Sequence, residues 1–156
     1  MTKLQHKISK KNPFDNIEEE TVLNLLHTSD LLQFQFRRLF RPFKLTEQQY
    51  NILRILRGHG VPMPSLAISK QMMTLVPAIT GLIDRMEKGG WVTRKRCDKD
   101  RRVVYVAITD LGIALLDQLD EPVGALDKSL VGHLSPNEMT TLISLLEKIR
   151  QPLETT

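Results

Sequence analysis

A change of hydrophobic period divides the stretch PAITGLIDRMEKGGWVTRKRCDKDRRVVYVAITDLG, residues 77–112. Up to Met86 the apolar residues recur at steps of three and four, which predicts a helix, and Gly89 and Gly90 end it. Residues 103–108 form a β-branched and aromatic run that predicts a strand, with 91–96 as its partner. The stretch therefore predicts a helix followed by a β-hairpin, and the loop at the tip of that hairpin is strongly cationic.

Upstream, the sequence predicts a long helix and then a shorter one. Asn16 and Glu19 fit a cap and its N3 partner at the start of the long helix, and Pro42 marks its end or a bend close to it. Thr46 and Gln49 fit a capping box at the start of the shorter helix. These local signals place two helices before the connector that leads to the quoted stretch.

A third helix is expected between the connector and the quoted stretch. Pro62 and Pro64 predict a stiff connector, and Ser65 is positioned to cap the helix that follows. Thr74–Val76 then predicts a turn, and Pro77 suits the first position of the next helix.

Downstream, two more helices are expected. Thr109 caps the first of them, and Pro122 and Gly124 should kink or split it. Ser135 and Glu138 combine an N-cap with an N3 carboxylate, the strongest helix start in the chain, and Pro152 is expected to close that last helix.

Composition bounds the class of protein. The chain has 156 residues, with 22 Lys+Arg against 18 Asp+Glu and a net charge of +4, which is typical of one ordinary globular domain. A single cysteine allows no intrachain disulfide, so a reducing cytoplasm is expected. The longest apolar run, Val103–Ile108, is too short to cross a membrane, and no secretory signal is visible. No two histidines have metal-ligand spacing, so neither a metal ion nor a cofactor is expected.

The charge is unevenly distributed along the chain. Residues 91–102 carry six basic and two acidic side chains, whereas 110–156 carry three basic and eight acidic ones. Such asymmetry favours a polyanion as the partner of the basic part, although a merely solvated hairpin has the same charge. No G-x-S-x-G, P-loop, Rossmann or H-E-x-x-H motif is present, so an enzyme is not expected.

Three short helices followed by a basic hairpin, within residues 46–109, have the order of a winged helix–turn–helix. In that arrangement the third helix, beginning near Val76, is the recognition helix and enters the DNA major groove. The arginines of the hairpin, or wing, can reach the DNA backbone or the adjacent minor groove.

Several blocks of the chain resemble the MarR family of bacterial transcription regulators. They are LIDRMEKGGWV, the tip DKDRR, Ile108-Thr109 followed by Gly112, and LTEQQYNILRIL at residues 45–56. The resemblance covers residues 20–150 and implies a mainly α (α+β) fold. It implies a homodimer with a basic tail (1–17), a helical dimerisation region (18–45 and 110–156) and a winged helix–turn–helix domain (46–109). Family members often repress transcription from near-palindromic operators and are released by small aromatic acids or by oxidation.

The resemblance also implies which residues face DNA. Asp100 would hold Arg102, and Arg102 would enter the minor groove. Phosphate contacts are expected at Lys99, Arg101, Arg94 and Arg96, and backbone contacts around the turn at Ser65, Lys70, Gln71 and Thr74. The recognition helix would present Pro77, Ala78, Thr80, Gly81 and Arg85.

Three alternatives remain open at this stage. The recognition helix carries Pro, Ala and Gly where the family more often has polar residues, so direct base readout is thin, and a fold-retaining interaction or non-specific DNA-binding module is an alternative. Arg85 could instead pair with Asp84 or Glu87. Cys97 lies among cations that favour a thiolate, so a redox sensor is conceivable beside the simpler interpretation of an ordinary surface cysteine.

Overall fold

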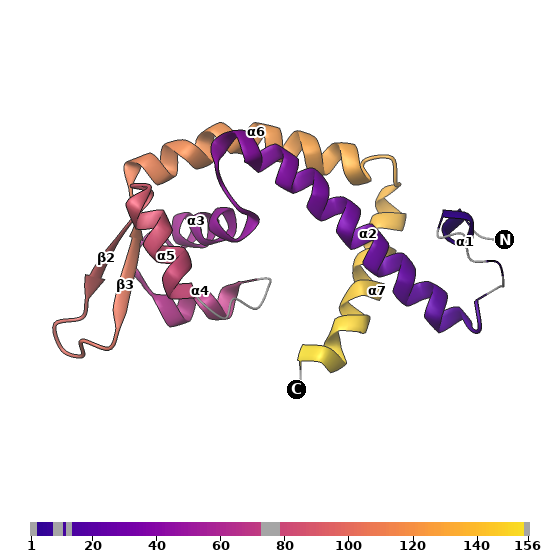
Figure 1. Ribbon diagram of the computed structural model, residues 1–156, viewed down its shortest axis with the longest axis horizontal. Helices are drawn as coiled ribbons and strands as arrows, with labels where there is room; N and C mark the ends of the chain where they lie inside the picture. Colours follow the sequence, from indigo (N-terminus) through magenta and orange to yellow (C-terminus); the bar gives the residue numbers. More distant parts are fainter. Residues whose placement is uncertain (1–2, 8–10, 12–13, 73–78, 155–156) are drawn as a thin grey trace. The chain divides into compact units, whose positions relative to one another are not determined.

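The computed structural model describes residues 3–7, 11, 14–72 and 79–154, so the predicted DNA contacts at Thr74, Pro77 and Ala78 lie outside the described residues. The chain separates into two compact units, residues 1–47 and 48–156. Figure 1 shows helices throughout and one small sheet. The predicted fold class, mainly α with a winged helix–turn–helix, is confirmed.

The first unit is helical. It contains α1 (Lys3–Lys7), the long α2 (Ile17–Phe40) and the 3-10 helix η1 (Arg41–Phe43). The side chain of Asn16 accepts a hydrogen bond from the Glu19 N–H at 2.7 Å, which confirms the predicted cap of α2. The chain leaves α2 at Pro42, as predicted, and Phe36 and Phe40 stack on each other near this end.

The second unit holds the sheet and the remaining helices. They are α3 (Glu47–His59), β1 (Met63–Pro64), α4 (Ser65–Gln71), α5 (Ile79–Lys88), β2 (Val92–Arg96), β3 (Val104–Ile108), α6 (Asp110–Val131) and α7 (Pro136–Glu154). The sheet has the order β1-β3-β2, and both pairs are antiparallel. The β2–β3 hairpin was predicted. β1 was not predicted. The segment expected to be a stiff connector instead forms a short strand, in which Met63 pairs with Val106.

The core of this unit joins α3, α4 and α5 to the hairpin and to the first half of α6. The apolar side chains with less than 2% exposure come from all of these elements and include Ile52, Leu53, Leu56, Ile68, Ile83, Met86, Val92, Val106, Leu116 and Leu119. Burial of this size stabilises each side chain by about 1.5–3 kcal/mol. The recognition helix and the wing are therefore positioned by one shared core.

A charged contact fastens α6 to α3 at the surface of that core. The Arg57 guanidinium donates to both carboxylate oxygens of Asp120, at 2.9 and 2.7 Å, and to Asp117 at 3.3 Å. The hydrogen bonds from Arg57 lower the pKa of Asp120. No sequence signal pointed to this bidentate pair, because the partners lie 63 residues apart.

At Pro122 the helix α6 is not split, because it runs to Val131 as one element with Leu119 and Val123 buried on either side of the proline. Two predictions at helix ends were wrong. Pro152 lies inside α7, which continues to Glu154. Ser65 is the first residue of α4 and makes no capping hydrogen bond, since Pro64 occupies the cap position.

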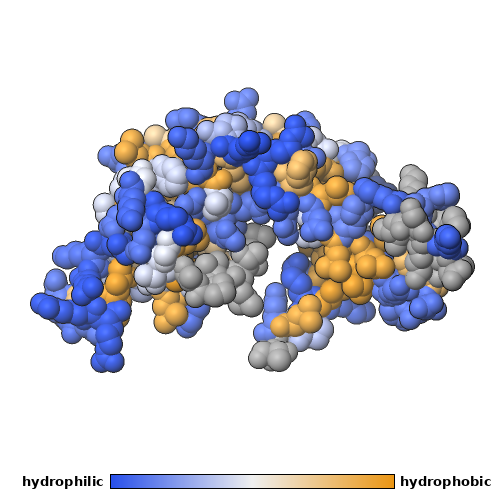
Figure 2. Space-filling view, in the orientation of Figure 1, coloured by the Kyte–Doolittle hydropathy of each residue, from blue (hydrophilic) through white to orange (hydrophobic). Residues whose placement is uncertain are grey.

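The last helix, α7, begins at the box that the sequence predicted. Ser135 N–H donates to Glu138 Oε2 at 2.8 Å, and Glu138 N–H donates to Ser135 Oγ at 3.3 Å. No residue of α7 is buried among those described. Its exposed apolar side chains are Leu142, Ile143, Leu145, Ile149 and Leu153, and hydrophobic surface is visible along this helix in Figure 2.

Candidate nucleic-acid interface

The recognition helix α5 ends in a tight turn that aims the chain into the wing. Gly90 has φ +77°, a conformation that suits glycine. Its N–H donates to the Glu87 carbonyl at 2.9 Å, and the Trp91 N–H donates to the Met86 carbonyl at 3.1 Å. These two bonds form a Schellman motif, so the direction of β2 relative to α5 is set within two residues.

The base of the wing is tied to both neighbouring helices through Thr109. Its Oγ1 accepts from the Gly112 N–H at 3.1 Å, which caps α6, and donates to the Gly90 carbonyl at 2.6 Å. The Thr109 N–H donates to the Trp91 carbonyl at 3.0 Å. A Cβ on Gly112 would lie 2.4 Å from that same carbonyl oxygen, so only glycine fits there. This contact explains the spacing of Ile108-Thr109 and Gly112.

At the wing tip, Asp100 holds Arg102. Asp100 Oδ1 accepts from the Arg102 N–H at 3.0 Å and lies 3.5 Å from Arg102 Nε. The loop is closed by the Cys97 N–H on the Val103 carbonyl and the Val103 N–H on the Asp100 carbonyl, both at 2.9 Å. The Arg102 side chain is nevertheless 95% exposed. The ion pair implied by the resemblance is thus formed and leaves the guanidinium accessible.

The other basic residues of the tip are exposed. Lys95 Nζ lies 3.8 Å from Asp98 Oδ2. Arg96 and Arg101 have no carboxylate partner within the described part of the chain and line a shallow hollow with Cys97 and Asp98. Figure 2 shows a hydrophilic surface over the hairpin. Lys99 is exposed. The tip presents several accessible cations to one region.

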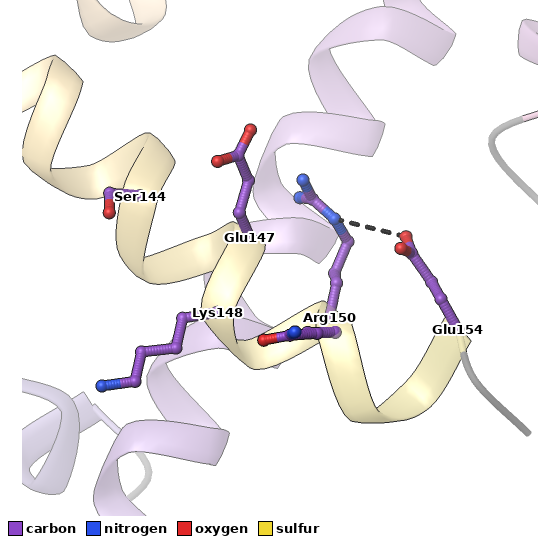
Figure 3. Close-up of a pocket in the computed structure, with 6 residues that line it drawn as sticks. Ser144, Glu147, Lys148, Arg150 and Glu154 are labelled. Atoms are coloured by element: carbon purple, nitrogen blue, oxygen red, sulfur yellow. Dashed lines mark ion pairs between the residues drawn. The ribbon is translucent and has the colours of Figure 1, made fainter.

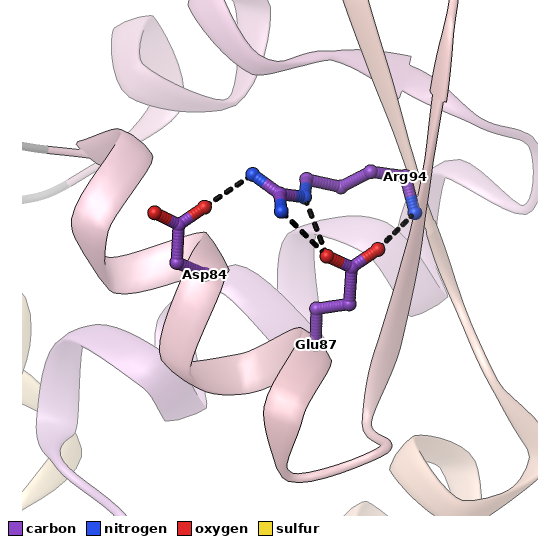
Figure 4. Close-up of polar contacts among 3 residues, drawn as sticks. All are labelled: Asp84, Glu87 and Arg94. Atoms are coloured by element: carbon purple, nitrogen blue, oxygen red, sulfur yellow. Dashed lines mark hydrogen bonds and ion pairs between the residues drawn. The ribbon is translucent and has the colours of Figure 1, made fainter.

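Arg94 differs from the other wing arginines because two carboxylates of α5 hold it. Its Nε and Nη2 donate to Glu87 Oε2 at 2.8 and 2.6 Å, and its Nη1 donates to Asp84 (Figure 4). The hydrogen bonds that Arg94 donates to Glu87 lower the pKa of Glu87 and raise the pKa of Arg94. Arg94, rather than Arg85, is therefore the partner of Asp84 and Glu87.

The free face of α5 carries little side-chain bulk. Thr80 and Arg85 are exposed, and Arg85 makes no ion pair in the described ranges. A Cβ on Gly81 would meet nothing within 4 Å. Ser65 is half-buried at the start of α4, and Lys70 and Gln71 are exposed in its last turn. These residues of α4 and α5, together with the cations of the wing, make up the candidate nucleic-acid surface.

Nothing in the described ranges competes with this surface as a functional site. No group of three metal-binding side chains occurs there, and no helix there is long and apolar enough to span a membrane. A hollow on α7 is lined by that one helix, and its ion pair joins Arg150 Nε to Glu154 Oε1 at 3.6 Å (Figure 3). Its lining is polar and open, without the converging groups of a reaction centre.

The fold and this surface define a winged helix–turn–helix protein. A model of the MarR family matches residues 45–104. A MarR transcription factor from Planctomyces limnophilus is 42% identical over 86% of this chain and 98% of its own, with a TM-score of 0.68. Mutant MarR from E. coli, in complex with operator DNA, is 27% identical over 85% and 95% of the two chains, with a TM-score of 0.74. The homoprotocatechuate degradative operon repressor of Escherichia coli is 27% identical over 85% of this chain and 88% of the repressor.

The chain belongs to the MarR family of transcriptional regulators.

Proposed function

We propose that this chain is a homodimeric, sequence-specific repressor that binds near-palindromic operator DNA and is released by a small molecule. The observation that carries the proposal is the pairing of an exposed α5 face with an Arg102-tipped wing on one shared core. Support comes from the relative that was crystallised with operator DNA and from the relative named as an operon repressor.

In this proposal α5 enters the major groove and the wing enters the adjacent minor groove. Arg102 reads the narrow minor groove, where the potential is most negative, while Lys99, Arg96 and Arg101 meet phosphates. Ser65, Lys70 and Gln71 contact the DNA backbone beside α4. Because Gly81 offers no side chain, much of the sequence preference comes from Thr80, Arg85, the wing and DNA shape.

A second copy of the chain is proposed to cover α7. A helix with several exposed leucines and isoleucines and no buried residue is costly to leave in water. An isologous pair would bury that face and place two recognition helices about one helical turn of DNA apart. The domain division follows: 46–109 reads DNA, and 18–45 with 110–156 builds the dimer.

The chain is proposed to leave its operator DNA when a small aromatic acid or similar effector binds. The support is the name of the homoprotocatechuate operon repressor, since homoprotocatechuate is an aromatic acid. DNA as the partner places the action of the chain in the bacterial cytoplasm.

The test is selection of bound duplexes from a random pool by the full chain, followed by titration of the enriched duplex with bulk competitor at physiological salt. A complex that survives the competitor, with an enriched site showing two-fold symmetry, is expected. A complex abolished by competitor, with no enriched sequence, would overturn specific repression and favour the alternative of a non-specific DNA-binding or interaction module. Ultracentrifugation in the same buffer tests the dimer.

A further inference from the structure

We propose that Arg94 is a positioning residue, which fixes the recognition helix against the wing, and is not a phosphate contact. The inference rests on the proposed function, because it concerns how α5 and the wing are presented to DNA. It reverses the role that sequence reasoning gave to this arginine.

The geometry joins one strand residue to one helix in two ways. Arg94 lies in the middle of β2, the edge strand beside β3, opposite Val106. Its main-chain N–H turns away from the sheet and donates to Glu87 Oε1 at 3.1 Å, while its side chain donates to Glu87 Oε2. One carboxylate of α5 therefore holds both the backbone and the guanidinium of the strand, and Asp84 holds the third nitrogen of the same guanidinium one helical turn earlier.

The charge balance argues against a phosphate at this place. One arginine faces two carboxylates, so the cluster has a net charge of −1, and all three guanidinium nitrogens are already donating. A phosphate would meet repulsion from the two carboxylates, which already hold the guanidinium through charge-assisted hydrogen bonds. Arg96, two residues further along β2, has no carboxylate partner in the described ranges and remains available for DNA.

The mechanical need for such a contact follows from the connection between the two elements. Only Gly89, Gly90 and Trp91 join α5 to β2 along the chain. A helix in the major groove and an arginine in the next minor groove must be held at one mutual angle to bind simultaneously. The Glu87–Arg94–Asp84 cluster joins α5 to β2 outside the buried core, and Figure 4 shows the three side chains converging.

The test uses the duplex that the wild-type chain selects from a random pool, with Kd measured between low and moderate KCl. Four variants are compared: Arg94→Gln, Glu87→Gln, their double mutant, and the matched control Arg96→Gln on the same strand. A lost phosphate contact makes the slope of log K against log salt shallower by about one per subunit. Melting temperatures identify any variant that fails to fold.

For a positioning role, Arg94→Gln weakens binding about tenfold with an unchanged salt slope, the loss expected for a contact within a coupled network. Glu87→Gln weakens binding as well, although it removes a negative charge and should otherwise favour DNA. The double mutant is no weaker than either single variant. Arg96→Gln, by contrast, makes the slope shallower.

Two results would overturn the inference. One is a shallower slope for Arg94→Gln that matches Arg96→Gln, and the other is tighter binding by Glu87→Gln. If Arg94→Gln does not fold, Glu87→Gln and Arg94→Lys decide, because the lysine keeps the charge but not the forked hydrogen bonds. Failure of the wild-type chain to select any duplex would refute the proposed function itself. Selection of a duplex, with the same change of salt slope for Arg94→Gln and Arg96→Gln, would refute only the positioning role.

Discussion

Replacing Gly112 by alanine should lower the free energy of unfolding of the winged domain, because the new Cβ would clash with a main-chain atom. It would lie 2.4 Å from the Trp91 carbonyl oxygen and 2.8 Å from a side-chain carbon of Ile108, whereas ordinary contacts lie at 3.4–4 Å. The carbonyl cannot simply move away, since it accepts the Thr109 N–H at 3.0 Å.

The expected change in the free energy of unfolding has two unfavourable contributions and one favourable one. Overpacking of this kind costs about 1–3 kcal/mol, a disturbed hydrogen bond costs about 1 kcal/mol, and alanine recovers up to about 1 kcal/mol of helix propensity. The net loss is about 2 kcal/mol, which lowers the melting temperature by roughly 4–8 °C for a chain of this size. Gly124→Ala is the matched control in the same helix, because a Cβ there meets nothing within 4 Å.

The assay is urea and thermal unfolding followed by circular dichroism, at one fixed protein concentration because dimer stability depends on concentration. Gly124→Ala should be neutral or more stable by up to about 1 kcal/mol. A Gly112→Ala protein that melts at or above the wild-type temperature would show that the close approach to Trp91 is not what requires glycine.

Three further predictions concern DNA binding and acid stability. Arg102→Ala should weaken binding to the selected duplex about tenfold with an unchanged melting temperature. Arg101→Ala should weaken binding to all duplexes alike and make the salt slope shallower by about one per subunit. Equal effects of the two changes would contradict a minor-groove role. Gly81→Ala should raise the melting temperature, because glycine inside a helix costs about 1 kcal/mol. The same variant should bind the selected duplex less tightly, because α5 is proposed to lie close to the base edges. Unchanged binding would show that Gly81 is not part of the interface. Because the pKa of Asp120 is lowered in the folded state, its stabilisation is present above the unfolded pKa and is lost as pH falls through the folded pKa. Asp120→Asn should therefore be less stable than wild type near pH 7, and urea unfolding should show the gap closing in acid; a gap that stays constant would argue against the Arg57 pair.

The features that sequence could predict are those encoded by near neighbours. The Ser135–Glu138 box lies within one turn, and the hairpin follows from strand-forming residues on both sides of a short loop. β1 has only two residues and exists because Met63 meets Val106, more than 40 residues away, which no local pattern reports.

The departures from the sequence predictions also have physical causes. Pro122 removes one helical hydrogen bond, but burial of Leu119 and Val123 holds both sides of it in one helix. The role of Arg94 was not visible because its charge suits a phosphate equally well. Its real partners become neighbours only after Gly90 turns β2 back alongside α5.

The hydrogen bonds around Thr109 join three elements at one place. The end of α5, the base of the wing and the first turn of α6 are tied through Thr109 to the carbonyls of Gly90 and Trp91. The direction in which each element leaves this place is therefore constrained by the other two. A substitution at Thr109 would disturb α5, the wing and α6 together rather than one of them alone.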